Sequence, residues 1–226
     1  MGKPDYSHID FPPPPRDRPY VVLNMVMSAD GKVVVEGTEK GIGSEVDQRL
    51  MRELRVNADV VLNGAETLRI SGTSPRLGGF AELEEIRTHQ GKSRFPIAAT
   101  LSRSGRLPLD RVFFTADDFR AVVYLSDSAP REQRLAIEST GREVVVVPDA
   151  EAPVAMLRHM RDYLGARVLL LEGGPSLNAM FFQQNLVDEY FLSLGPVIVG
   201  GRESLTAVEG GEAPQGDEVL REARPA

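Results

Sequence analysis

The chain has 226 residues, 42% apolar and 26% charged, and its 26 Lys and Arg against 33 Asp and Glu give a formal net charge of −7. This composition is typical of a folded globular protein, and the negative balance argues against nucleic acid as a partner. With no Cys, only three widely spaced His, no apolar run of about 18 residues and no secretion signal, we expect no disulfide, metal site or membrane partner, and a cytoplasmic location.

The chain begins with a proline-rich arm, residues 1–19, in which Pro12 to Pro15 favour an extended conformation over a helix. From Tyr20 onward, apolar runs of strand length alternate with amphipathic stretches. Several runs are almost continuously apolar and rich in Val and Ile, as expected of strands that helices cover on both faces. The predicted strands are residues 20–27, 59–63, 96–101, 121–126, 143–148, 167–172 and 190–199.

Helix signals lie between these strands. The clearest is Ser44-Glu45-Val46-Asp47, which resembles a capping box and precedes a run of apolar positions. A second helix is predicted over residues 152–164, and a third begins at Pro175 and ends before Asn185. The alternation of strands and helices predicts one α/β domain over residues 20–226, with a mostly parallel central sheet flanked by helices and a polar tail from about residue 202. A short strand is expected near residues 217–221.

Sheets of this kind bind ligands at the carboxyl ends of their strands. The strongest motif there is the run at residues 169–178, an apolar strand that stops at Glu172 and enters a helix through Gly173 and Gly174. Glycines let the backbone approach a ligand closely, and the free N–H groups of a new helix suit a phosphate. The run matches neither G-x-G-x-x-G nor Walker A, so a simple turn capped by Ser176 is the alternative.

Polar residues also lie at the end of the first predicted strand and at the end of the capped helix. Ser28, Asp30 and Lys32 follow the first strand, although an ordinary turn would also explain an Asp-Gly pair. Arg55 ends the capped helix, with Asp59 as a possible ion-pair partner.

The next strand runs into Gly64 and a new helical turn. This arrangement brings backbone donors and the Thr67 hydroxyl to the same edge, as a second possible anion site. A helix cap beside a solvated arginine surface is the alternative.

Taken in chain order with Val187-Asp188-Glu189 and the run at 196–201, these motifs resemble the C-terminal reductase domain of bifunctional riboflavin biosynthesis proteins and the stand-alone pyrimidine reductases of that pathway. The likeness covers residues 18–201. It implies a dihydrofolate-reductase-like fold, a homodimer and NADPH as cofactor. A hydride from the nicotinamide would reduce the sugar carbon of a ribosylamino-pyrimidine 5′-phosphate and open the ribose to a ribityl chain.

The same resemblance implies roles for individual residues. Asp30, Lys32 and Glu172 are expected at the reacting centre, with Asp30 orienting groups or handling a proton and Glu172 on the pyrimidine side. Substrate contacts are expected from Asn24, Ser28, Arg55 and Arg76. Cofactor contacts are expected from Val26, Thr67, Ser71, Ser102, Gly173, Gly174, Ser176, Leu177 and Asn178. Arg103 would read the adenosine 2′-phosphate, unless it is an exposed residue of a Ser/Gly turn.

The chain departs from the family on the substrate side. Where such enzymes often read Gly-Glu-Ser-x-Trp-Ile, this chain has Glu39 and Lys40 and no aromatic residue at position 41, and residues 68–76 also differ. A reductase of another small heterocycle such as a pterin, or a nucleotide-binding relative without turnover, are therefore alternatives. The sequence has neither the Cys-x-x-Cys nor the His-x-Glu zinc ligands, so we expect this chain to lack the zinc deaminase half of the bifunctional proteins.

Overall fold

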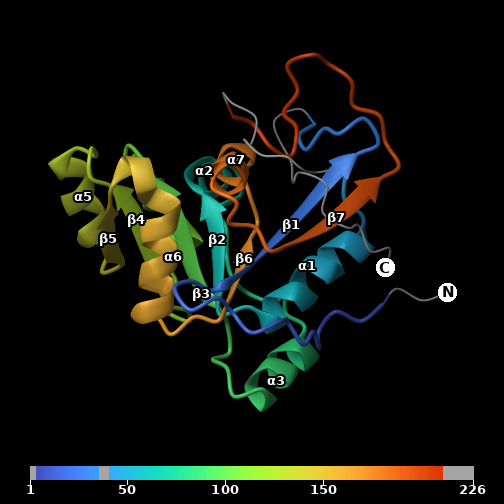
Figure 1. Ribbon diagram of the computed structural model, residues 1–226, viewed down its shortest axis with the longest axis horizontal. Coiled ribbons are helices and arrows are strands. Elements are labelled where there is room, and N and C mark those ends of the chain that lie inside the picture. Colours follow the sequence, from blue (N-terminus) through green and yellow to red (C-terminus); the bar gives the residue numbers. More distant parts are fainter. Residues whose placement is uncertain (1–3, 36–40, 211–226) are drawn as a thin grey trace.

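The computed structural model describes residues 4–35 and 41–210, which leaves the strand expected near 217–221 and the Glu39–Lys40 pair outside the described residues. A seven-stranded sheet runs through the domain in the order β5-β4-β3-β2-β6-β1-β7 (Figure 1), and all of its pairings are parallel. The strands are β1 (Tyr20–Ser28), β2 (Val60–Gly64), β3 (Ile97–Ser102), β4 (Ala121–Ser126), β5 (Glu143–Val147), β6 (Val168–Leu171) and β7 (Glu189–Gly195). The predicted α/β fold with a parallel sheet is confirmed.

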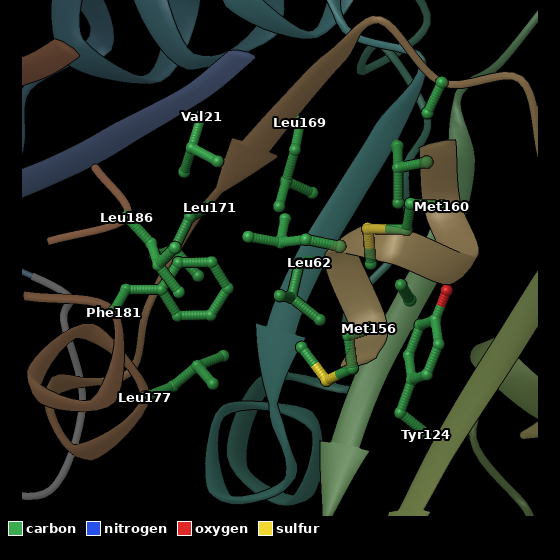
Figure 2. Packing of buried hydrophobic residues seen from close by; sticks show 14 of the residues in the cluster. Val21, Leu62, Tyr124, Met156, Met160, Leu169, Leu171, Leu177, Phe181 and Leu186 are labelled. Carbon is green, nitrogen blue, oxygen red and sulfur yellow. The ribbon is translucent and has the colours of Figure 1, made fainter. Parts of the chain in front are cut away.

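Helices cover both faces of the sheet. They are α1 (Glu45–Asn57), α2 (Ala65–Ser71), α3 (Ala81–His89), α4 (Val112–Thr115), α5 (Arg131–Glu138), α6 (Ala152–Asp162) and α7 (Pro175–Gln183), with a short 3-10 helix at Asp149–Glu151. On one face α6 and α7 pack on alternate residues of the strands, as Met156, Met160 and Phe181 do against Leu62 and its neighbours (Figure 2). On the other face α1 packs over the β6–β1 side and α2 to α5 over the β3–β4 side.

Helix α1 is fixed at both ends. At its start, the Ser44 hydroxyl accepts a hydrogen bond from the Asp47 N–H at 3.4 Å, as the capping signal predicted. At its end the guanidinium of Arg87, only 1% exposed, donates to the carbonyls of Arg55 and Val56 at 3.0 Å each and of Ala58 at 2.5 Å. Burial lowers the pKa of Arg87 to about 10, so it stays charged at neutral pH and holds the last turn of α1 in place.

The N-terminal arm packs against the last turns of α1 and does not lead away from the domain. The Tyr6 N–H donates to the Glu53 carboxylate at 3.1 Å, and the Asn57 side chain donates to the Tyr6 carbonyl at 2.7 Å and accepts from the Ile9 N–H at 3.1 Å. The Tyr6 ring also meets the edge of Phe191 on β7, with ring centroids 5.7 Å apart. The arm thereby seals the apolar layer beneath α1.

Strand β7 is shorter than predicted. It ends at Gly195 because Pro196 follows and cannot donate a ladder hydrogen bond. It is an edge strand, and its alternate residues Tyr190, Leu192 and Leu194 are exposed by 36, 40 and 65%. The strand is therefore not buried on both faces, which leaves the apolar side chains of one face uncovered in the single chain.

Candidate active site

The topology brings the predicted motifs together. Strands β2, β6 and β1 are neighbours at the centre of the sheet, so their carboxyl ends place Gly64, Glu172 and Ser28 along one edge. The sequence alone did not give this order, because β6 lies between two strands that precede it in the chain. A parallel sheet that changes winding direction at this point offers a crevice for a ligand.

Backbone contacts between two loops form a narrow cradle at this edge. The Gly64 N–H donates to the Gly173 carbonyl at 2.7 Å, and the peptide bond between Gly173 and Gly174 is cis. Gly173 has φ +78°, and a Cβ added there would lie 3.0 Å from the Met25 sulfur. A Cβ on Gly174 would lie 3.1 Å from the Thr67 hydroxyl oxygen. A side chain at Gly173 would need a left-handed backbone and would press on Met25, and one at Gly174 would press on Thr67, so the two glycines keep the cradle narrow.

Two helices begin side by side at this cradle. Helix α2 starts after Gly64 and α7 after Gly174, and neither N-cap residue supplies a side-chain hydrogen bond. Helix N-termini carry partial positive charge and free N–H groups, so two adjacent termini favour an anion such as a diphosphate. Asn178, fully buried in the first turns of α7, donates to the Ala207 carbonyl at 2.8 Å, and its Oδ1 has no partner within the described part of the chain. The residues present fit the diphosphate of a dinucleotide.

A buried ion pair lies next to the cradle. The Nε and Nη2 atoms of Arg55 donate to the two carboxylate oxygens of Glu172 at 2.7 Å each, and the two side chains are only 9% and 7% exposed. Arg55 also donates to the Arg76 carbonyl at 2.8 Å, and Asn63 approaches Glu172 at 3.4 Å. This bidentate pair ties the end of α1 to the end of β6.

The alternative pairing of Arg55 with Asp59 is wrong. Asp59 lies beyond the end of α1, forms an ion pair with Lys92 and accepts the backbone N–H groups of Arg167 and Val168 at 2.8 and 2.9 Å. Asp59 therefore joins the amino ends of β2 and β6 and does not take part in the crevice.

Two further polar residues lie near the ion pair. Asn24 on β1 is 8% exposed. It lies one residue beyond the pairing of Leu23 with Leu171, which places it beside Glu172. Its Oδ1 has no hydrogen-bond partner among the described residues. Arg52 lies one turn before Arg55; burial and the nearby Arg55 lower its pKa, which Glu172 partly offsets. Arg52 forms no ion pair with a residue that the structure describes. It was missed in the sequence because its helix offered no signal to separate it from surface arginines.

The turn after β1 is organised by Asp30. Its carboxylate accepts hydrogen bonds from the Ser28 hydroxyl at 2.6 Å and from the N–H groups of Val199 and Gly200 at 3.1 and 2.7 Å. Lys32 in turn donates to the Ser204 carbonyl at 2.8 Å. These bonds hold the segment after β7 against the end of β1.

The hydrogen bond from Ser28, followed by those from Val199 and Gly200, lowers the pKa of Asp30 to about 2 from its ordinary value of 3.8. Because the folded-state pKa is the lower one, the ionised carboxylate stabilises the fold above about pH 4, and this contribution is lost as the pH falls toward 2. We expect Asp30→Asn to be less stable than the wild type at neutral pH and the difference to shrink as the pH falls through this range. Denaturant unfolding at several pH values checks this; a difference that stayed constant would contradict it.

Four of the sequence-predicted residues lie in other interactions. The Ser102 side chain is buried, with its hydroxyl accepting the Gly105 N–H at 3.0 Å, and the Ser71 hydroxyl donates to the Thr67 carbonyl at 2.8 Å. The Arg76 guanidinium binds Asp118 through two hydrogen bonds of 2.8 Å. Arg76 therefore contacts Arg55 through its backbone carbonyl and not through its side chain. Arg103 is 76% exposed and lies 3.6 Å from Asp149.

A family model for the RibD C-terminal domain matches residues 19–223. The chain belongs to this family. The chain is 33% identical over 195 residues to the 2,5-diamino-6-ribosylamino-4(3H)-pyrimidinone 5′-phosphate reductase of Archaeoglobus fulgidus, which covers 85% of the chain and 87% of that protein. The reductase of the same name from Methanothermobacter thermautotrophicus is 32% identical over 193 residues, 85% of either chain.

A solved structure of a pyrimidine reductase-like protein from Corynebacterium diphtheriae shares the fold. It has a TM-score of 0.73 at 22% identity and covers 83% of this chain and 78% of its own. The family resemblance read from the motifs is confirmed, and as a RibD C-terminal domain with reductases among its relatives the chain is an oxidoreductase.

In this RibD C-terminal domain, none of the helices among residues 4–35 and 41–210 has the length and apolar character to cross a membrane.

Proposed function

We propose that the chain is an NADPH-dependent reductase that converts a ribosylamino-pyrimidine 5′-phosphate to its ribitylamino form in riboflavin biosynthesis. The observation that carries this proposal is the meeting of two uncapped helix N-termini, at Gly64 and Gly174, beside the buried Arg55–Glu172 pair. A dinucleotide diphosphate suits the first feature, and a polar substrate with a phosphate suits the charges around the second. The names of the relatives support the reaction.

The cradle would hold the cofactor. The backbone at Gly173 and Gly174 and the first turn of α7, with Ser176, Leu177 and Asn178, would bind the diphosphate. Val26, Thr67 and Ser71 would line the same edge, and Ser102 would shape it through the turn that its hydroxyl holds. Bound NADPH supplies a hydride to the sugar carbon of the substrate. The protein contributes orientation and charge.

The crevice on the α1 side would hold the substrate. Arg52, Arg55 and Lys32 would face its phosphate and ribose, and Asn24 and Glu172 its ring. Ser28 and Asp30 would keep the turn that carries Lys32 in position. Because Asp30 is ionised at neutral pH and accepts three hydrogen bonds, its proposed role is orientation and not proton donation.

Mixing the purified protein with NADPH and, separately, the ribosylamino-pyrimidine phosphate before and after deamination tests this proposal. The nicotinamide absorbance is expected to fall with at least one of the two pyrimidines. It is expected to stay constant when dihydrofolate is added in their place. NADPH binding without oxidation by either pyrimidine would overturn the proposed reaction. Oxidation with dihydrofolate alone would favour a pterin reductase.

We propose a homodimer that forms through the exposed face of β7. Tyr190, Leu192 and Leu194 line one face of this edge strand, and Ile198 follows it at 74% exposure. Contiguous apolar residues of this kind mark an interface, and an edge strand that faces a second copy is protected from unspecific pairing. Separately, we propose that the protein is located in the cytoplasm, and cell fractionation tests this location.

Leu194→Lys is expected to convert the dimer to a monomer in sedimentation, because it places a charge on the apolar face of β7. Leu135→Lys is the matched control, since Leu135 is also an exposed leucine, 52% exposed on α5, but lies on another part of the domain. A wild type that sediments as a monomer, or equal effects of the two substitutions, would contradict the proposed interface.

A further inference from the structure

We propose that Arg52 recognises the 5′-phosphate of the substrate, and that Gly78 leaves the space in which the Arg52 guanidinium lies. The pair would make the enzyme select a phosphorylated over a dephosphorylated ribosylamino-pyrimidine. The inference rests on the proposed function and deepens it, because it assigns phosphate selectivity to one residue and to the glycine that admits it.

Arg52 lies on the side of α1 that borders the crevice. Helix α1 leads from the segment after β1 to the amino end of β2, so Arg52 lies one turn nearer to the carboxyl ends of the strands than Arg55. Residues three apart are neighbours on a helix surface. The charges of Arg55 and Glu172 both act on the pKa of Arg52, which places its guanidinium near the buried ion pair. Arg52 is half-buried, so a ligand in the crevice can reach it.

Gly78 lies against the Arg52 side chain from the loop after α2. This loop runs along α1, since the Arg76 carbonyl accepts a hydrogen bond from Arg55 at 2.8 Å two residues earlier. A Cβ built on Gly78 would lie 1.9 Å from Nε and 2.5 Å from Cδ of Arg52. The backbone of Gly78 also has φ +74°, which residues with a side chain rarely adopt. The Arg52 guanidinium therefore occupies space that exists because residue 78 is glycine.

The hydrogen-bond donors of Arg52 are free, whereas those of Arg55 are committed. Arg55 uses Nε and Nη2 on Glu172 and Nη1 on the Arg76 carbonyl. Within residues 4–35 and 41–210, Arg52 forms no hydrogen bond or ion pair. Burial and the charge of Arg55 lower the pKa of Arg52, so a neighbouring anion would stabilise its charged form.

A phosphate monoester fits this cation better than the other parts of the substrate do. It carries about −1.5 to −2 charges at pH 7, and it can accept two parallel hydrogen bonds from one guanidinium. The pyrimidine ring and the ribose are uncharged. A hydrogen bond to a charged group contributes about 10- to 100-fold in affinity. The wild type is expected to prefer the phosphorylated pyrimidine by at least such a factor in kcat/KM.

Arg52→Gln tests the inference directly. We expect it to lower kcat/KM for the phosphorylated pyrimidine by about 10- to 100-fold and to leave kcat/KM for the dephosphorylated compound nearly unchanged, because only the phosphate loses its partner. Arg158→Gln is the matched control. It removes the same charge from an exposed position on α6, which covers the other face of the sheet, and should leave the ratio of the two values unchanged.

Gly78→Ala tests the second half of the pair. Its methyl group would push the guanidinium aside, so we expect the same loss of phosphate preference with Arg52 still present. Combining it with Arg52→Gln should cause no further loss of preference, because both changes remove one contact. Gly79→Ala controls for backbone strain, since Gly79 has φ +80° but nothing within 4 Å of an added Cβ.

The outcomes separate the inference from the proposed function. Equal losses with both pyrimidines, or no loss with either, overturn the role of Arg52, while turnover of the phosphorylated compound preserves the reductase. A loss of NADPH affinity alone would mean that Arg52 binds a cofactor phosphate, which also overturns the inference.

Calorimetry with both pyrimidines compares the affinities without turnover. A wild type that binds the phosphorylated compound through Arg52 but oxidises no NADPH overturns the proposed reaction alone, and one that binds neither pyrimidine overturns both proposals. If Arg52→Gln does not fold, the ratio in Gly78→Ala decides, and an unchanged ratio overturns the inference.

Discussion

Replacing Arg55 with Met is expected to lower the free energy of unfolding by about 3–5 kcal/mol and to reduce kcat/KM by about 100-fold or more. The reason is that Glu172, the ion-pair partner of Arg55, would remain buried without its cation. Glu172 is 7% exposed and would lose both of its short hydrogen bonds, which leaves a desolvated carboxylate beside the cofactor cradle. Denaturant unfolding and NADPH oxidation measure the two effects separately.

A double-mutant cycle distinguishes the pair from simple loss of packing. Arg55→Met with Glu172→Gln is expected to recover much of the lost stability, because no unpaired charge remains, but not the activity. Arg134→Met on α5 is the control. Arg134 and its partner Glu138 are 48% and 37% exposed, so losing this pair should cost about 1 kcal/mol or less and leave turnover nearly unchanged. A stability loss at Arg55 no larger than at Arg134 would refute the argument.

Gly173→Ala is expected to weaken NADPH binding by about 10- to 100-fold. The added methyl group would lie 3.0 Å from the Met25 sulfur on a backbone with φ +78°, so the loop must shift and the cradle opens. Gly174→Ala should act in the same direction, since its methyl group would meet the Thr67 hydroxyl at 3.1 Å. Fluorescence titration with NADPH gives the dissociation constants.

Gly79→Ala separates backbone strain from loss of the cradle. Gly79 has φ +80° but nothing within 4 Å of an added Cβ, so it suffers the conformational cost without a collision. We expect its substitution to lower stability and leave NADPH affinity within about twofold of the wild type. Equal losses of affinity at Gly79 and Gly173 would mean that the glycines matter only for folding.

The sequence predicted elements well where local chemistry decides the structure. The strand at Ala121–Ser126 was predicted to the residue because it is fully buried, and the start of α1 was predicted because Ser44 caps it. Helices α3, α4 and α5 were missed. In α5 only Ile137 is buried, so no apolar periodicity marks it, and in α3 one of the two buried residues is Arg87, which reads as a surface residue in any sequence. Burial of a cation depends on tertiary contacts that no local pattern contains.

The same limit applies to the crevice. The turn from β6 into α7 was predicted, because two glycines after an apolar strand indicate a tight strand-to-helix turn from the local sequence alone. The Arg55–Glu172 pair joins residues that are 117 positions apart, and the nearby Asp59 was the more obvious partner in the sequence. Spatial neighbours from distant strands decide which charges act together.

The strand order also has a consequence for synthesis. Strands β2 to β5 are consecutive in the chain and adjacent in the sheet, so they can assemble as they leave the ribosome. Strand β1 comes first but pairs only with β6 and β7, and Tyr20 meets Val168 roughly 150 positions later. At typical translation speeds that delay is on the order of ten seconds, during which the apolar first strand has no sheet partner. The crevice forms only when the last strands arrive, so a nascent chain that stalls before β6 contains most of the domain but none of its assembled active site.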